Sequence, residues 1–235
     1  MSSFNVRSVI YKYLWLICFA IGLSGFVYIY FYKPHTAEIK TVWDYLFKII
    51  MFMFLSSGFA FFPNKSKNSF LWLIPLIVIY AGFVGSRLDY VGFRLLASGD
   101  ITQYEINEYY IALYLILYPF LISCISFSYR MGGGTSGNCI KLSFVGVLVL
   151  FSSFLDVMFE ITNPIIIPKV IEYNYYFKVI VGHFPSFPEE VIFCLCHIPL
   201  IVGFLMLPID RWIERIFQVE NKPNLSEGMH RLNAQ

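Results

Sequence analysis

The chain has 235 residues, of which 58% are hydrophobic and 14% are charged, whereas a typical soluble domain is about 25% charged. A soluble fold with this composition would expose large apolar patches, so the composition predicts an integral membrane protein. The formal net charge of +2 is small, and neither a basic stripe nor an RNA-binding motif is present, so the sequence predicts no nucleic-acid partner.

Apolar stretches long enough to span a membrane are the main structural signal, because a spanning helix needs about 20 apolar residues. Six stretches meet this requirement: residues 13–31, 44–62, 70–90, 109–129, 142–161 and 191–209. The first resembles a signal peptide because Arg7 and Lys12 precede it, but it is longer than the usual apolar core and no A-x-A-like cleavage site follows. We therefore expect an all-α polytopic membrane protein with one transmembrane domain over residues 1–209.

The distribution of Lys and Arg predicts the orientation of these spans. With the N-terminus in the cytoplasm, the inner segments carry more basic residues than the outer ones. The inner residues are Arg7, Lys12, Lys65, Lys67, Arg130, Lys141, Arg211, Arg215, Lys222 and Arg231. The outer residues are Lys33, Lys40, Lys48, Arg87, Arg94, Lys169 and Lys178. Both termini are therefore expected on the cytoplasmic side of a cell inner or plasma membrane.

The outer segment over residues 162–190 is too apolar for an ordinary solvated loop. Val170, Tyr173, Phe177, Ile180 and Val181 recur there at helical spacing. This pattern favours a helix that lies in the membrane interface or re-enters partway. A seventh full span is the alternative, and it would move the C-terminus outside.

A polar cluster is predicted inside the membrane. Asp156 and Glu160 are one helical turn apart on the fifth predicted span. His197 is expected at a similar depth on the adjacent antiparallel helix, roughly 9 Å from the outer boundary, with Cys194 on the same face. One interpretation is structural: Asp156 bonds to His197 between helices, while Glu160, Glu189 and Glu190 lie at the interface.

The functional interpretation of this cluster is a proton relay, a cation site or a metal site, because ionisable groups inside membranes are functional candidates by default. A metal site would use Cys194, His197 and Asp156, but no zinc signature is present. The sequence identifies no catalytic residue and predicts no cofactor. Arg87 and Asp89, at the outer end of the third span, are either interfacial anchors or the edge of an outward-facing polar cavity.

Residues 210–235 are predicted to form a cytoplasmic amphipathic helix followed by a flexible tail. Trp212, Ile213 and Phe217 alternate with charged residues there, so they are candidates for binding a protein partner. The glycine-rich stretch over residues 130–139 lacks the G-K-[ST] ending of a phosphate-binding loop and is expected to be a flexible hairpin.

Three classes of function fit these features. The favoured expectation is a membrane component that acts by binding or oligomerisation, such as a sensor, immunity, exclusion or defence protein, because no catalytic motif is recognisable. Such a protein would form a homo-oligomer or bind a cytosolic or membrane protein. A small channel or transporter with a polar site at Asp156, Glu160 and His197 is one alternative. An intramembrane enzyme that uses the same residues is the other.

Overall fold

The structure is a computed structural model, and it describes residues 6–32, 41–63, 84, 88, 91–92, 109, 111–162, 169–172 and 174–217. All regular elements in these ranges are helices, as the sequence predicts. They are α1 (Val6–Tyr32), α2 (Val42–Ala60), the π-helix η3 (Ile111–Leu117), α6 (Tyr118–Met131), α7 (Ser136–Phe151), α8 (Phe154–Thr162), α9 (Tyr175–Val181), α10 (Phe187–Met206) and α11 (Ile209–Phe217).

Three of these helices, α1, α2 and α10, are long and apolar enough to cross a bilayer. They coincide with the predicted spans 13–31, 44–62 and 191–209, so the helices indicate a membrane protein. The predicted span 109–129 falls on η3 and α6, neither of which has the length of a span by itself. The predicted span 70–90 lies outside the described residues except for Val84 and Leu88. The number of six spans therefore stays a prediction.

The continuous fifth helix predicted over residues 142–161 is wrong, because the chain breaks between α7 and α8. The two helices meet at an angle of 55°, and as one broken span they would make a fourth crossing. Ser153 at the break has a left-handed φ of 61°. The Ser152 hydroxyl donates to the carbonyl of Val149 at 2.8 Å and accepts from the N–H of Phe154 at 3.3 Å. Serine side chains that bond to nearby backbone in this way compete with the helix.

Side chains that cap helix N-termini fix where several helices begin. Thr41 accepts from the N–H of Asp44 at the start of α2, and Thr135 accepts from the N–H of Asn138 at the start of α7. Asn174 caps α9, which ends at the left-handed Gly182 with a φ of 98°. The segment predicted as an interfacial or re-entrant helix thus contains a short helix of seven residues.

The interface between α1 and α2 depends on close backbone approach and on aromatic packing. A Cβ atom at Gly22 would lie 2.6 Å from the backbone nitrogen of Leu55, so only glycine fits there. Next to it, the ring of Phe19 meets the ring of Phe59 edge to face, with centroids 4.7 Å apart. Small residues that let helices approach closely are typical of helix packing in membranes.

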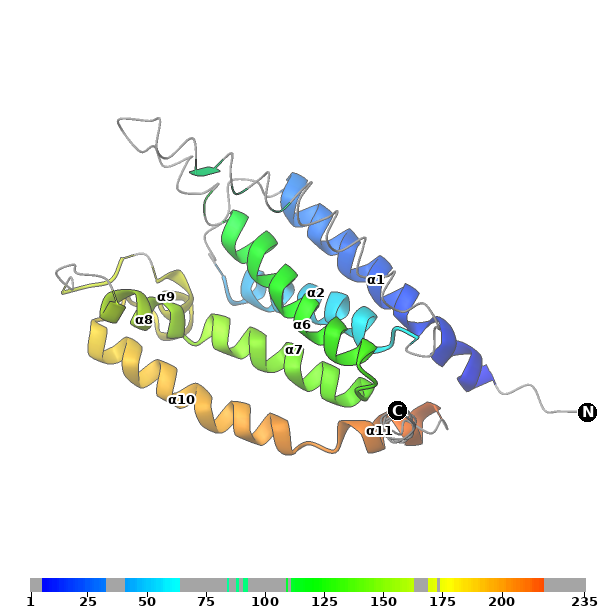
Figure 1. Cartoon of the computed structure of the whole chain (residues 1–235). Coiled ribbons are helices and arrows are strands. Elements are labelled where there is room, and N and C mark those ends of the chain that lie inside the picture. Colours follow the sequence, from blue (N-terminus) through cyan, green and yellow to red (C-terminus); the bar gives the residue numbers. More distant parts are fainter. Residues whose placement is uncertain are drawn as a thin grey trace, which may run out of the picture.

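One end of the molecule holds α11 against the start of α7, and we call it the α11 end (Figure 1). The carboxylate of Asp210 accepts from the N–H of Gly137 at 2.8 Å and from the hydroxyl of Thr135 at 2.9 Å. Gly137 has to be glycine, since a Cβ atom would lie 2.7 Å from the backbone nitrogen of Asp210. Tyr11 of α1 lies here too, with its ring centroid 5.3 Å from that of Phe217. The start of α1 and α11 therefore share one end, and the side of the membrane that it faces stays a prediction.

The glycine-rich hairpin at the α11 end is held by a buried arginine. Arg130, only 6% exposed, donates from Nε to the carbonyl of Phe62 at 3.0 Å and from Nη1 to the carbonyl of Gly134 at 2.8 Å. These bonds join the chain that follows α2 to the turn that follows α6. The hairpin predicted to be flexible is thus packed against α2 and α11.

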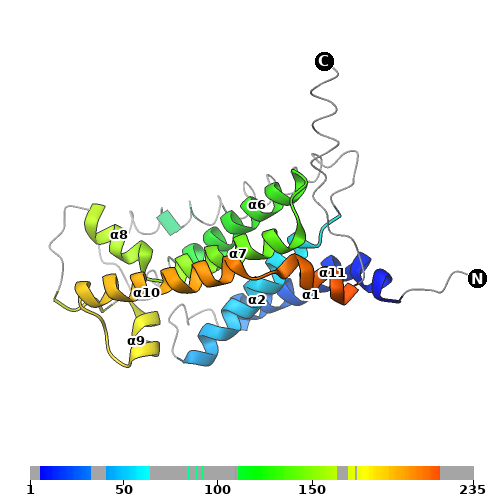
Figure 2. The same cartoon turned by 90° about the horizontal axis from the view of Figure 1, so that it is seen from below.

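The opposite end of the molecule brings together α8, α9 and the start of α10, and we call it the α9 end (Figure 1). Seen from below, α8 and α9 flank the start of α10 (Figure 2). The ring of Phe151, the last residue of α7, contacts Tyr45 of α2 and Tyr176 of α9, with centroids 5.0 Å and 5.3 Å away. This packing fixes α9 beside the break between α7 and α8.

Replacing Gly22 with alanine is expected to weaken the fold, because the new methyl group collides with the backbone of Leu55. Overpacking of this kind costs roughly 1–3 kcal/mol. Gly203→Ala on α10 is the matched control, since nothing lies within 4 Å of a Cβ atom at Gly203. Unfolding by denaturing detergent in mixed micelles measures both. Equal stability of the Gly22 variant and the wild type would contradict the described α1–α2 interface.

Candidate functional site

A buried asparagine lies at the centre of the α9 end. The Nδ2 atom of Asn174 donates to Ser153 Oγ and to Glu190 Oε1, each at 2.6 Å, and lies 3.4 Å from Asp156 Oδ2. Its Oδ1 atom accepts from the N–H of Phe177 at 3.1 Å and so caps α9. Asn174 is fully buried. One carboxamide therefore connects the α7–α8 break with α9 and α10.

Three acidic side chains, from Asp156, Glu160 and Glu190, form the polar part of this site, and we call them the acid cluster. Asp156 Oδ2 and Glu190 Oε1 both lie near the Nδ2 atom of Asn174, at 3.4 Å and 2.6 Å, and Glu160 follows Asp156 by one turn of α8. Glu190 is 0% exposed and Glu160 is also buried. The structure thus adds Glu190, which the sequence placed at the interface, to the predicted pair.

Among the described residues, hydrogen-bond donors to Asp156 and Glu190 are scarce. The amide nitrogen of Asn174 carries two hydrogens, yet it faces three acceptors, and the contact to Asp156 is the long one. The Oε2 atom of Glu190 is buried and has no hydrogen-bond partner among the described residues. No Lys or Arg in the described part of the chain forms an ion pair with Asp156 or Glu190. A buried carboxylate in these surroundings needs a proton or a cation.

The break between α7 and α8 positions the acid cluster. The backbone carbonyl of Ser153 accepts from the N–H of Val157 at 2.9 Å, so α8 starts directly at the break. Because α8 turns away from the axis of α7, Asp156 and Glu160 face the start of α10. If α7 and α8 formed one straight helix, Asp156 would lie further along the axis of α7 instead.

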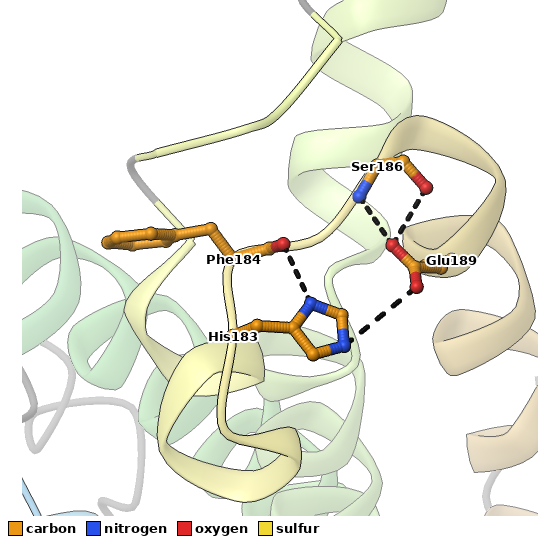
Figure 3. Close-up of polar contacts among 4 residues, drawn as sticks. All are labelled: His183, Phe184, Ser186 and Glu189. Atoms are coloured by element: carbon orange, nitrogen blue, oxygen red, sulfur yellow. Dashed lines mark hydrogen bonds and ion pairs between the residues drawn. The ribbon is translucent and has the colours of Figure 1, made fainter.

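Two neighbouring glutamates at the start of α10 point in different directions and have different partners. Glu189 accepts from both the N–H and the hydroxyl of Ser186 at 2.7 Å and so caps the helix (Figure 3). His183 Nε2 lies 3.9 Å from the other oxygen of Glu189, and its Nδ1 donates to the carbonyl of Phe184. Glu190 is one residue further along the helix and therefore points about 100° away, towards Asn174. Glu189 has a structural role, and Glu190 belongs to the buried site.

His197 and Cys194 take no part in the acid cluster as described. His197 Nδ1 lies 2.8 Å from the carbonyl oxygen of Phe193, and since that oxygen only accepts, Nδ1 carries the hydrogen. The imidazole also packs against the ring of Phe193, with centroids 4.7 Å apart. His197 follows Glu190 by two helical turns, about 10 Å along α10. Among the described residues, no hydrogen bond joins it to Asp156.

The other predicted site residues lie elsewhere. Arg87 and Asp89 lie outside the described residues. Within the described ranges, no group of three His, Cys, Asp or Glu side chains is arranged to hold a metal ion. Of the predicted partner-binding residues, Ile213 is buried and the ring of Phe217 packs against Tyr11 and Phe61. Trp212 alone of these three residues is exposed, at 44%.

Two residues at the centre of the site were missed in the sequence. Asn174 stands directly before an apolar helical run, which is the position of an N-cap. Ser153 follows Ser152 within a long apolar stretch, where a pair of serines is a plausible site for a helix break. Both signals are local and can be recognised in the sequence. Neither of them shows that the two side chains meet.

Comparison of the chain with protein-family models, with curated proteins and with solved structures finds no match. The site therefore has to be interpreted from its own geometry.

Replacing Asn174 with aspartate tests the role of the carboxamide. Aspartate keeps an oxygen that caps α9, but it removes both N–H donors and adds a negative charge beside Glu190. We expect the free energy of unfolding to fall by about 3 kcal/mol or more. Asn138→Asp is the matched control, because Asn138 bonds to the hydroxyl of Tyr129 at an exposed position. A similar stability of both variants in detergent unfolding would show that Asn174 does not support the acid cluster.

Proposed function

We propose that this chain is a multi-pass membrane protein, a small channel or transporter, whose acid cluster binds protons. The observation that carries the proposal is Glu190, a fully buried carboxylate with one oxygen that has no hydrogen-bond partner among the described residues. Binding of positive charge at this oxygen would complete the site. The chemistry of the site is neutralisation of buried carboxylates by protonation.

Electrostatics supports this proposal. Neighbouring carboxylates in a medium of low dielectric constant repel one another, and each loses its hydration. Asn174 is neutral and offsets only part of this cost. A site that is stable only when it holds positive charge is suited to taking up and releasing that charge, as acidic residues do in membrane pumps and transporters.

The broken helix supports the transport interpretation in particular. Transporters form ion sites where helices are interrupted, because the freed backbone and side-chain oxygens face the ion. Here the break at Ser152 and Ser153 lies directly beside the acid cluster, and the hydroxyl of Ser153 bonds to Asn174. The break therefore lies where an ion site would use it.

The alternative of action by binding or oligomerisation receives less support from the geometry. The residues predicted to bind a protein partner are Trp212, Ile213 and Phe217, but two of these side chains pack within the chain itself. Exposed apolar side chains do cover much of α1 and α10. Membrane lipid can cover such faces, so they do not require a second copy of the chain.

Glu190→Gln tests the proposal. Wild-type protein in proteoliposomes is expected to carry protons down an imposed electrical potential, detected with a trapped pH dye. The variant keeps the size of the side chain but removes its charge, so we expect at least a tenfold loss of flux.

Glu189→Gln is the control for this experiment, because an amide oxygen can still accept from Ser186 and cap α10. Its flux should match that of the wild type. Stability should move in the opposite direction to activity: Gln at position 190 is neutral without a bound proton and carries two amide hydrogens, so unfolding should become harder by about 1–3 kcal/mol. Wild-type liposomes with no more flux than protein-free liposomes would contradict the proposal.

A further inference from the structure

The exposed side of α11 carries two stripes of different chemistry. At about 100° per residue, Arg211 and Arg215 form one stripe, and Trp212 and Ile216 form the next. All four side chains are exposed, Trp212 at 44% and Ile216 at 58%. None of the four has a hydrogen bond or an ion pair within the described part of the chain. An apolar stripe beside an arginine stripe is the pattern of a helix at a membrane surface.

Contacts on the opposite side of α11 keep these stripes from rotating. Ile209 and Ile213 are buried, and Phe217 packs against Tyr11. The carboxylate of Asp210 is held by Gly137 and Thr135. Because Asp210 points towards the start of α7, its charge does not face the arginine stripe. The outward orientation of the four exposed side chains is therefore fixed by the fold.

The position of α11 along the chain places it at headgroup depth. The 20 residues of α10 rise by about 30 Å, which is the thickness of the hydrocarbon core. Ile209, the first residue of α11, comes three positions after Met206, the last residue of α10. If α10 spans the membrane, α11 begins where the phosphates are. The start of α1 lies at the same end of the molecule (Figure 1), and its first turns carry the exposed Arg7 and Lys12.

We propose that the exposed face of α11 binds the headgroups of anionic phospholipids. Trp212 and Ile216 enter the boundary between headgroups and acyl chains, where aromatic and apolar side chains are favoured. Arg211 and Arg215 donate to the lipid phosphates, for which the planar guanidinium is well suited. This interaction is separate from ion binding at the acid cluster, which lies at the other end of the molecule.

Hydrogen–deuterium exchange of the full chain in lipid nanodiscs tests this inference. Two kinds of nanodisc are compared, one of phosphatidylcholine alone and one with added phosphatidylglycerol. We expect the amides of residues 209–217 to exchange several-fold more slowly in the anionic discs. Each basic residue at an anionic surface contributes about fivefold in binding. The double variant Arg211→Gln, Arg215→Gln should therefore lose this difference.

The double variant Arg211→Lys, Arg215→Lys should keep most of the slowing, since it keeps the charge. Lys178→Gln is the matched control, because it removes an exposed positive charge on α9, at the other end. Added salt screens the charges and should erase the slowing in the wild-type protein. This part of the test needs no substitution, so it does not depend on whether a variant folds. Equal exchange in both kinds of disc would overturn the inference. If the amides of residues 209–217 exchanged more slowly only after a soluble protein was added, this face would bind a protein and not lipid. That result would also overturn the inference.

Discussion

The α9 end of this protein depends on one carboxamide, that of Asn174. Its oxygen caps α9, and its nitrogen offers two hydrogens to Ser153, Glu190 and Asp156. Because these acceptors come from the α7–α8 break, α8 and α10, the same amide fixes the relative positions of three helices. It also leaves Asp156 and Glu190 short of donors, since two hydrogens cannot satisfy three acceptors and Glu190 Oε2 is left without a partner in the described structure. The geometry that holds the helices together is therefore also what makes the site receptive to positive charge.

The two ends of the molecule differ in how fully they supply hydrogen-bond donors to a carboxylate. At the α11 end, Asp210 accepts from the N–H of Gly137 and from the hydroxyl of Thr135, and it lies at the N-terminus of α7, where negative charge is favourable. That carboxylate locks α11 in place. At the α9 end, Glu190 is fully buried, and the described residues supply a donor to only one of its oxygens. Fully satisfied polar groups stabilise a fold, whereas incompletely satisfied ones mark sites at which stability is exchanged for function.

Much of the framework could be predicted from the sequence, because length and apolarity alone define a spanning helix. Those two properties located α1, α2 and α10, and the scarcity of charge singled out Asp156 and Glu160. Tertiary structure decided the rest. The paired serines change the direction of the chain, which moves Asp156 from the level of His197 to that of Glu190. Adjacent glutamates look alike in sequence, and only the rotation of α10 distinguishes the cap Glu189 from the buried Glu190. Similarly, the amphipathic pattern of α11 identified its apolar residues but not which of them face α1.

Infrared spectroscopy of the carboxyl groups tests the central claim most directly, which is that the acid cluster holds positive charge in the folded protein. Wild-type protein is expected to show the carbonyl stretch of a protonated carboxylic acid, and Glu190→Gln should remove or shift this band. A spectrum without a protonated band, and identical in the variant, would contradict the account.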